Sequence, residues 1–345
     1  MLILICPISL HRALENTSME RNQKFALVVI VLVVGSVGAF ALLNTAPAPD
    51  VRIGYLSQDL HQLALRVAVE KGWFEEAGLT VELSLYQNGG YEMDGFRAGQ
   101  IDMGYLGAAP ALVKSINEGT AVTILAAVNL EGSALMVLKS AYDSDEITNI
   151  TDLSGKTVFY PGPPTVQSFL LRLALNQSGM TIDDITPQTT SVTYMEDSLS
   201  EASPAFIAWE PFAAKAEASG AAVPLLLSED IWPNHPCCVV GTSNSFLESN
   251  PDVVQKVVNI HKRAEEWIVS NPAEAIEIAI DWLEMDEGIV QTAFERIIYS
   301  YELDRIGIER YLEFLIDEEI VTLDHSEAEA YLDGFINTTF IEQAP

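Results

Sequence analysis

The stretch LHQLALRVAVEKGWFEEAGLTVEL, residues 60–83, joins a helix pattern directly to a strand pattern. Apolar residues three and four positions apart over residues 60–71 predict an amphipathic helix, which Gly72 ends. Residues 73–79 are expected to form a turn, and residues 80–86 alternate as a strand does. A helix, a glycine turn and a strand in this order are typical of an α/β fold.

Similar elements continue on both sides of this stretch. The pattern predicts strands at 51–56, 101–106 and 122–129 and helices at 91–98 and 110–117. Strands that alternate with helices at this spacing favour a parallel sheet with helices on both faces.

A second, weaker copy of the pattern follows, and then a helical region. Residues 157–160 are expected to form a strand and 165–177 a helix, so a weak repeat of about 100 residues indicates two similar α/β lobes. From about Pro251 the chain becomes acidic and amphipathic. Helices are predicted there at 252–269, 272–283, 287–299 and 308–317.

The charge of the chain excludes one broad class of function. Its 345 residues include 18 Lys or Arg and 49 Asp or Glu, which gives a formal net charge of −31. Because nucleic-acid recognition needs clustered basic side chains, a nucleic-acid-binding protein is excluded. The hydrophobic fraction of 49% is sufficient for a well-filled core.

Residues 25–43, FALVVIVLVVGSVGAFALL, contain no charged side chain and follow Arg21 and Lys24. A basic flank before an apolar run of this length is typical of a signal peptide or a membrane anchor, and both alternatives stay open. Residues 1–24 are expected to be a poorly ordered N-terminus, and residues 44–50 a linker. The rest of the chain is expected outside the cytoplasm.

Motifs for common catalytic chemistry are absent from the sequence. It contains no GxxxxGK[ST], HExxH, CxxC or GxSxG motif, and its histidines lack the spacing of metal ligands. The adjacent Cys237 and Cys238 would point to opposite faces of a regular strand, so we expect two buried thiols rather than a disulfide or a metal pair. The sequence therefore predicts no catalytic residue, no metal site and no cofactor.

Several turns are expected at the carboxyl ends of strands, where open α/β sheets bind ligands. Most of these turns begin a helix, so free backbone N–H groups face the mouth, and Gly or Ala lets a ligand approach the backbone. The candidate ligand-binding residues are Ser57, Gln58, His61, Tyr105, Gly107, Ala108, Glu131, Ser133, Gly162, Thr165, Trp209 and Glu210. None of them is Arg or Lys, so a neutral or cationic heterocycle stays open beside an anion.

Four segments resemble a known family. The stretch quoted first and MDGFRAGQIDMGYLGAAPAL (residues 93–112) resemble motifs of solute-binding proteins of the nitrate/sulfonate/taurine class, which serve ABC importers. FIAWEPF (residues 206–212) and HPCCVVGTSNSFLESNPD (residues 235–252) resemble later segments of the same family. The resemblance extends over about residues 51–345.

The resemblance implies a two-lobed, periplasmic-binding-protein-like α/β fold of type II, with mixed, mostly parallel sheets and flanking helices. Lobe 1 would comprise residues 51–134 and 240–345, and lobe 2 residues 135–239. Hinge strands would lie near residues 133–137 and 238–242. Closure of the two lobes would enclose a ligand.

The implied function is that of an extracytoplasmic solute-binding protein of an ABC importer, without enzyme activity. The implied solute is of the taurine, alkanesulfonate or nitrate class. Binding of a thiamine pyrimidine precursor, or a pyrimidine-synthase-like enzyme on the same fold, is the alternative. The expected partners are the solute, the permease with its ATPase, and the membrane through the N-terminal segment; a monomer is expected.

Overall fold

The computed structural model describes residues 48–345, and Pro49–Pro345 form one compact unit. The predicted signal peptide or anchor at residues 25–43 lies outside the described residues, as do residues 1–24 and most of the linker. None of the helices formed by residues 48–345 is both long enough and apolar enough to cross a membrane.

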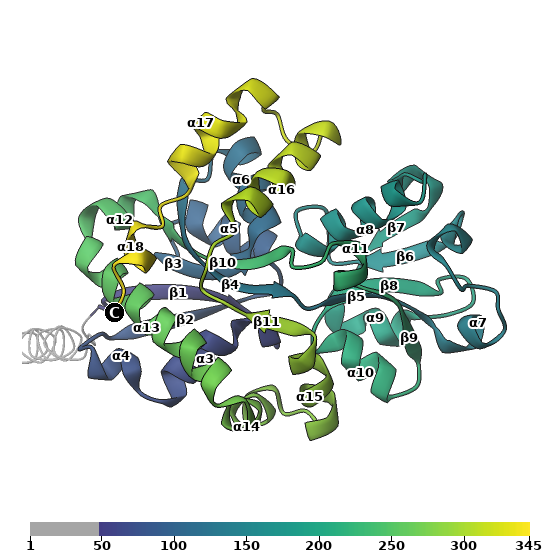
Figure 1. Cartoon of the computed structure of the whole chain (residues 1–345), viewed down its shortest axis with the longest axis horizontal. Helices are drawn as coiled ribbons and strands as arrows, with labels where there is room; N and C mark the ends of the chain where they lie inside the picture. Colours follow the sequence, from purple (N-terminus) through teal and green to yellow (C-terminus); the bar gives the residue numbers. More distant parts are fainter. Residues whose placement is uncertain (1–47) are drawn as a thin grey trace, which may run out of the picture. The chain divides into compact units, whose positions relative to one another are not determined.

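The first of two sheets has the strand order β11-β4-β10-β3-β1-β2 (Figure 1). Its strands are β1 (Val51–Leu56), β2 (Val81–Tyr86), β3 (Met103–Gly107), β4 (Val122–Glu131), β10 (Pro236–Ser243) and β11 (Ile297–Tyr299). β1 pairs in parallel with β2 and β3, whereas β10 runs antiparallel between β3 and β4. β3 and most of β4 are buried along their whole length, as expected for central strands covered on both faces.

The second sheet has the order β7-β6-β8-β5-β9. Its strands are β5 (Ser133–Leu138), β6 (Thr157–Tyr160), β7 (Thr186–Thr189), β8 (Ala205–Trp209) and β9 (Ala222–Leu227). β6 pairs in parallel with β7 and β8, and β5 is antiparallel to β8 and β9. The mixed two-sheet α/β fold expected from the sequence is confirmed.

Helices cover both sheets. Around the first sheet lie the 3-10 helix η1 (Leu60–Gln62) and the α-helices α3 (Leu63–Glu70), α4 (Trp73–Glu76), α5 (Gly89–Arg97), α6 (Ala108–Glu118), α12 (Asn244–Ser249), α13 (Pro251–Ser270), α14 (Pro272–Leu283), α15 (Glu287–Glu295), α16 (Arg305–Asp317), α17 (His325–Phe335) and α18 (Thr339–Glu342). Around the second lie α7 (Lys139–Asp143), η2 (Ile150–Leu153), α8 (Val166–Gln177), η3 (Ile182–Asp184), α9 (Val192–Ser198), α10 (Phe212–Ala218) and α11 (Ser228–Ile231).

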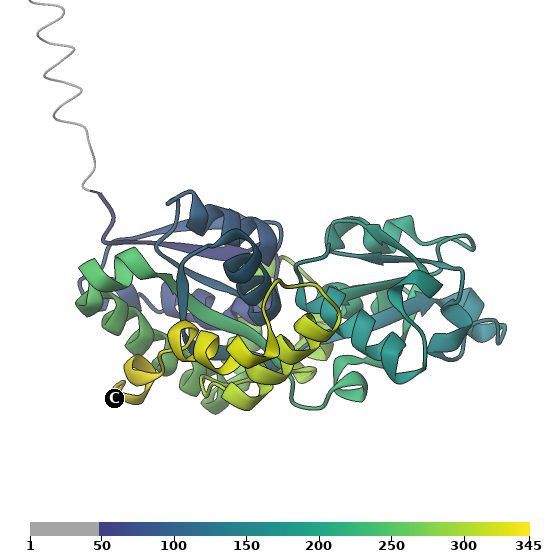
Figure 2. The same cartoon turned by 90° about the horizontal axis from the view of Figure 1, so that it is seen from above.

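The chain passes between the sheets twice. It leaves the first sheet through Gly132, between β4 and β5, and returns through residues 228–235, between β9 and β10. The segments 133–137 and 238–242, expected to act as hinges, therefore belong to different sheets, and the crossings lie next to them. Figures 1 and 2 both show the two sheets side by side, with the C-terminal helices returning to the first. The lobe boundaries stay a prediction.

Three local expectations were wrong. Residues 73–79 contain the short helix α4 rather than only a turn. The strands around the quoted stretch do not form a purely parallel sheet, because β10 enters from far along the chain and separates β3 from β4. The helix expected at 287–299 ends at Glu295, and Ile297–Tyr299 pairs with β4 as β11. The last two errors have one cause: pairing between distant segments leaves no local pattern.

Candidate functional site

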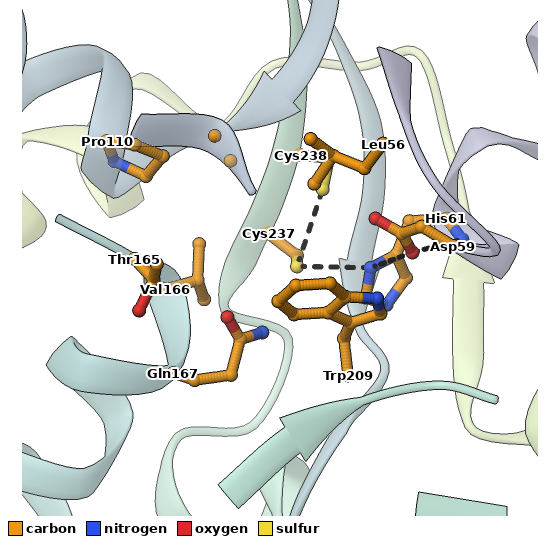
Figure 3. Close-up of a pocket in the computed structure, with 12 residues that line it drawn as sticks. Leu56, Asp59, His61, Pro110, Thr165, Val166, Gln167, Trp209, Cys237 and Cys238 are labelled. Atoms are coloured by element: carbon orange, nitrogen blue, oxygen red, sulfur yellow. Dashed lines mark hydrogen bonds and ion pairs between the residues drawn. The ribbon is translucent and has the colours of Figure 1, made fainter. Parts of the chain in front are cut away.

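A buried pocket lies where the two sheets meet. It is bounded by the carboxyl ends of β1, β3 and β8, the first turn of α8 and the start of β10 (Figure 3). The lining residues are Leu56, Asp59, His61, Gly89, Gly107, Pro110, Thr165, Val166, Gln167, Trp209, Cys237 and Cys238. This is the place where α/β sheets of this kind bind ligands.

The pocket is narrow. Its cavity volume is about 20 Å³. One water molecule or a comparably small group fits without any movement. A larger solute therefore requires the walls to move apart.

His61 forms one wall and is fixed by its own turn. Asp59 caps the N-terminus of η1. Its carboxylate accepts a hydrogen bond from the His61 backbone N–H at 3.0 Å and lies 3.0 Å from the ring Nδ1. Burial alone would lower the pKa of His61, but Cys237 and Asp59 outweigh it and raise that pKa well above its ordinary value. Asp59 and His61 are each only 1% exposed.

Gly132 makes room for this histidine. Its backbone has a φ of +84°, and a Cβ at this position would overlap the Nε2 end of the His61 ring. Only glycine combines this conformation with such a close approach at little cost. The crossing from β4 to β5 and the position of His61 are therefore linked.

Cys237 and Cys238 lie on the same side of the pocket, contrary to the expectation of opposite faces. The pairing of β10 with β4 shifts register around Cys238, and this irregularity brings both sulfurs toward the cavity. Their Sγ atoms are 3.7 Å apart, and Cys237 Sγ is 3.9 Å from His61 Nδ1. Both cysteines are buried free thiols, as the sequence predicts.

The two thiols differ in acidity. The hydrogen bond with Cys238 lowers the pKa of Cys237 well below its ordinary value, and the charge of His61 acts in the same direction against the effect of burial. The same hydrogen bond, together with burial, raises the pKa of Cys238. Cys237 is therefore the more readily ionised thiol of the pair.

The opposite wall comes from the second sheet and carries no charged side chain. Thr165 caps α8 by accepting a hydrogen bond from the Ser168 backbone N–H at 3.2 Å. Gln167 donates to Ser133 Oγ at 2.9 Å. Trp209, at the end of β8, is 3% exposed, and its Nε1 has no hydrogen-bond partner among residues 48–345. Figure 3 shows its indole ring lying beside His61 and Cys237.

Four predicted site residues line this pocket together: His61, Gly107, Thr165 and Trp209. Ser133 lies one hydrogen bond behind it, through Gln167. The remaining predicted residues do not line it; they are Ser57, Gln58, Tyr105, Ala108, Glu131, Gly162 and Glu210.

Three of those residues have structural partners instead. Glu131 accepts a hydrogen bond from the Asn234 backbone N–H at 2.6 Å. Glu210 accepts from the Ala214 backbone N–H at 2.9 Å and from Arg296 at 3.0 Å. Tyr105 packs edge-on against His261 in the core, with ring centroids 5.4 Å apart.

Sequence reasoning did not place Leu56, Asp59, Gly89, Pro110, Val166, Gln167, Cys237 or Cys238 among the candidates. Asp59 could have been found, because it precedes His61 in a turn after a strand. Gln167 also had a local signal, as a polar residue in the first turn of a predicted helix. The cysteines had none, because their approach to the pocket depends on an irregular strand.

This α/β fold, with a pocket where its two sheets meet, is of the periplasmic-binding-protein type. The chain belongs to the NMT1-like family, whose pattern it matches over residues 44–283. A Brucella abortus protein described as a binding protein is 25% identical over 79% of this chain and 82% of its own length.

Solved structures show the same fold. The periplasmic nitrate-binding protein NrtA from Synechocystis superposes with a TM-score of 0.75 at 18% identity, over 86% of this chain and 89% of its own. The alkanesulfonate-binding protein SsuA from Xanthomonas axonopodis, bound to MOPS, gives a TM-score of 0.70 at 16% identity, over 81% of this chain and 96% of its own. The predicted resemblance to nitrate and sulfonate binders is thus confirmed, and the three relatives named above are described as binding proteins.

Proposed function

We propose that this chain is the solute-binding component of an ABC importer. It captures a small solute of the sulfonate or nitrate class between two lobes and delivers it to a membrane permease with its ATPase. The observation that carries the proposal is the buried pocket between the two sheets, at the carboxyl ends of their strands. The relatives favour this function over a pyrimidine-synthase-like enzyme.

Contacts across the pocket support a closed arrangement of the two lobes. Asn88 donates to the Pro161 carbonyl at 3.2 Å, and the Leu60 backbone N–H donates to the Glu210 carbonyl at 3.2 Å. Phe169 of α8 packs on Tyr311 of α16, with ring centroids 4.0 Å apart. These contacts would separate if residues 135–239 moved away from residues 51–134 and 240–345, which would let the solute enter.

The donors that face the pocket support an oxyanion. The first turn of α8 presents backbone N–H groups that have no helical partner, and the helix dipole favours negative charge there. Trp209 adds an unpartnered indole N–H, and the raised pKa of His61 favours a positive charge on the imidazole. A sulfonate or nitrate oxygen can accept from such donors, although no Arg or Lys lines the pocket.

The N-terminal segment completes the proposal. An extracytoplasmic binding protein must be exported, and residues 25–43 supply either a cleaved signal or an anchor. The negative charge of the rest of the chain suits a monomeric protein on the outer side of the membrane.

The proposal is tested by thermal unfolding of the chain with taurine, alkanesulfonates, nitrate and a pyrimidine, all in the presence of a metal chelator. A solute at 100 times its Kd stabilises the folded state by about 2.7 kcal/mol. We expect stabilisation by at least one sulfonate or by nitrate. Stabilisation by the pyrimidine alone would support the alternative, and no response at millimolar solute would contradict both.

Trp209→Phe sharpens this test, because it keeps an aromatic ring and removes only the indole N–H and part of the ring. We expect about tenfold weaker solute binding by calorimetry, corresponding to about 1.4 kcal/mol. Trp267→Phe is the matched control, since Trp267 packs on Trp73 and does not line the pocket. Equal affinity in both variants would remove Trp209 from the binding site.

A further inference from the structure

Three metal-binding side chains converge at the base of the pocket. His61 Nδ1, Cys237 Sγ and Cys238 Sγ all lie within 4.8 Å of one another, and all three residues are buried. No other group of His, Cys, Asp or Glu within residues 48–345 has this arrangement. The function proposed above does not use the two thiols.

We propose that His61, Cys237 and Cys238 bind a thiophilic metal ion of the Zn²⁺ type, leaving a fourth position open to the pocket. Soft thiolate ligands select zinc, Cu⁺ or related ions over Mg²⁺ and Ca²⁺. Three protein ligands and one open position are typical of zinc sites that also bind an exogenous ligand. This inference goes beyond the solute-binding function and departs from the sequence-based expectation of no metal site.

Two of the three ligand separations already fit such an ion, and the third, between His61 and Cys238, is at most 4.8 Å. A tetrahedral zinc ion with Zn–S bonds of about 2.3 Å places its two sulfurs about 3.8 Å apart, and a sulfur and a nitrogen about 3.6 Å apart. The observed separations are 3.7 Å between the two Sγ atoms and 3.9 Å between Cys237 Sγ and His61 Nδ1. A disulfide needs about 2.05 Å between the sulfurs, so the geometry suits a bridging ion better than a bond.

The surrounding fold holds these ligands in place. The register shift in β10 turns both sulfurs to one side, and the Asp59 carboxylate accepts from the His61 backbone N–H at 3.0 Å. Gly132 leaves the space that the imidazole ring occupies. Ligands on rigid elements, each positioned by a neighbour, are the arrangement that metal sites require.

Charge and volume also agree. Two thiolates and a neutral imidazole balance a 2+ ion, and two protons are released on binding, which leaves the Asp59 carboxylate, 3.0 Å from the His61 ring, as the one remaining charge of the cluster. The cavity volume of about 20 Å³ suits one ion with one small ligand. The open position would face Trp209 and Thr165, on the side where the solute is expected.

The experiment uses the full chain with Cys6→Ser, so that Cys237 and Cys238 are its only thiols. The reduced, chelator-treated protein is titrated with Co²⁺ and then Zn²⁺, with no solute present. We expect one Co²⁺ per chain with the absorption bands of tetrahedral thiolate coordination, displacement by Zn²⁺, release of two protons, and protection of both thiols from alkylation. Mg²⁺ should do none of this.

Variants separate the site from adventitious binding. Cys237→Ser, Cys238→Ser and His61→Gln should each weaken Zn²⁺ binding at least about tenfold. His325→Gln is the matched histidine control, because His325 pairs with Asp317 on the surface and should leave binding unchanged. A folded, reduced Cys6→Ser protein that shows no thiolate absorption with Co²⁺ and no thiol protection by Zn²⁺ would overturn the proposal. Because the solute test contains a chelator and this test contains no solute, each can fail without the other.

Discussion

The two sheets differ in what they bury around the pocket. On the side of the first sheet, titratable side chains lie inside the protein with at most 3% exposure; Asp59, His61, Cys237 and Cys238 line the pocket, whereas Glu92, His261 and Glu265 are buried away from its lining. On the side of the second sheet, the buried polar groups are hydroxyls and amides such as Thr165 and Gln167. There are two exceptions: Glu210, which Arg296 from the other side neutralises, and His235, in the segment that returns to the first sheet.

This difference assigns a separate task to each wall. A wall of neutral groups can approach or leave a fixed set of charged groups without having to bury or expose a charge of its own. The first sheet therefore sets the electrostatics and the pH response of the pocket, whereas the second supplies shape, an aromatic ring and helix N–H groups. The following predictions test that division.

The largest effect is expected at the crossing between the two sheets. Gly132→Ala would place a Cβ into the His61 ring and against Ile297, at a φ of +84° that alanine rarely adopts. We expect a loss of about 4 kcal/mol in the free energy of unfolding, together with loss of solute binding.

Gly119→Ala is the control for this substitution. Gly119 also has a positive φ, of +67°, but nothing lies within 4 Å of its added Cβ. Its cost should be about 1 kcal/mol, from the backbone alone. Chemical denaturation of both variants measures the difference, and equal losses would show that Gly132 does not support His61.

The second effect concerns Glu210, whose carboxylate is buried on the side of the second sheet. Glu210 is fully buried and its carboxylate is paired with Arg296, whose side chain is 15% exposed. Arg296→Met leaves that carboxylate without its partner, so we expect a loss of about 3 kcal/mol. Arg296→Met with Glu210→Gln should recover much of this loss in denaturation measurements.

A surface pair serves as the control. Arg305 and Asp333 form an ion pair with side chains 40% and 68% exposed. Arg305→Met should cost under about 0.5 kcal/mol. If Arg296→Met and Arg305→Met were equally stable, pairing with Arg296 would not be what stabilises the buried Glu210 carboxylate.

The third effect is a pH dependence of stability that arises from helix α13, which covers the first sheet. Burial lowers the pKa of His261 to about 4, and its Nε2 lies 2.7 Å from the Ala127 carbonyl. The folded protein then holds a neutral imidazole while the unfolded chain takes up a proton below about pH 6.5. Stability from this group is present above that pH and is lost as the pH falls toward about 4. Between about pH 7 and pH 5 the unsubstituted chain should lose about 2 kcal/mol of unfolding free energy through this group. The His261→Gln variant should not show that loss.

Glu265 acts in the opposite direction. Burial raises its pKa well above the ordinary value, so the folded protein binds a proton that the unfolded chain has released. Its contribution to stability is present below the unfolded pKa and is lost as the pH rises through the folded pKa. Relative to the unsubstituted chain, Glu265→Gln and His261→Gln should therefore change the pH slope of the unfolding free energy with opposite signs. The same sign for both would contradict the assignment of these protonation states.

Much of the fold followed from the sequence because its helices and strands carry local patterns. The stretch at residues 60–83 predicted α3 and β2, and the helix expected at 165–177 is α8, which Thr165 caps. The position of β10 between β3 and β4 could not be predicted, since pairing between residues 240 and 105 depends on packing rather than on neighbours in sequence.

The position of the pocket could be predicted from the sequence, but only some of its lining residues could. The rule that ligands bind at carboxyl ends of strands brought together His61, Gly107, Thr165 and Trp209. The same rule also offered Glu131 and Glu210, which do not line this pocket and whose carboxylates accept hydrogen bonds from the backbone of Asn234 and Ala214. This rule did not identify Cys237 and Cys238. A regular strand would have placed their side chains on opposite faces, and only the irregular β10 brings them together.

The smallest effect is expected at the start of α8, on the side of the pocket that belongs to the second sheet. Thr165 is 4% exposed; its hydroxyl caps α8 at Ser168 and donates to the Gly162 carbonyl at 2.7 Å. Thr165→Ala should cost about 1 kcal/mol in stability, the usual cost of a lost helix cap. Ser243→Ala removes the comparable cap of α12, which does not line the pocket.

Both cap variants should therefore unfold at similar denaturant concentrations, but only one should bind solute differently. If the first turn of α8 contacts the solute, Thr165→Ala loosens that turn and weakens binding a few-fold, whereas Ser243→Ala leaves calorimetric affinity unchanged. The pH dependence of binding should be the same in both variants, because neither removes a titratable group from the wall of the first sheet. A changed pH dependence in Thr165→Ala alone would mean that the two walls do not divide their tasks as proposed.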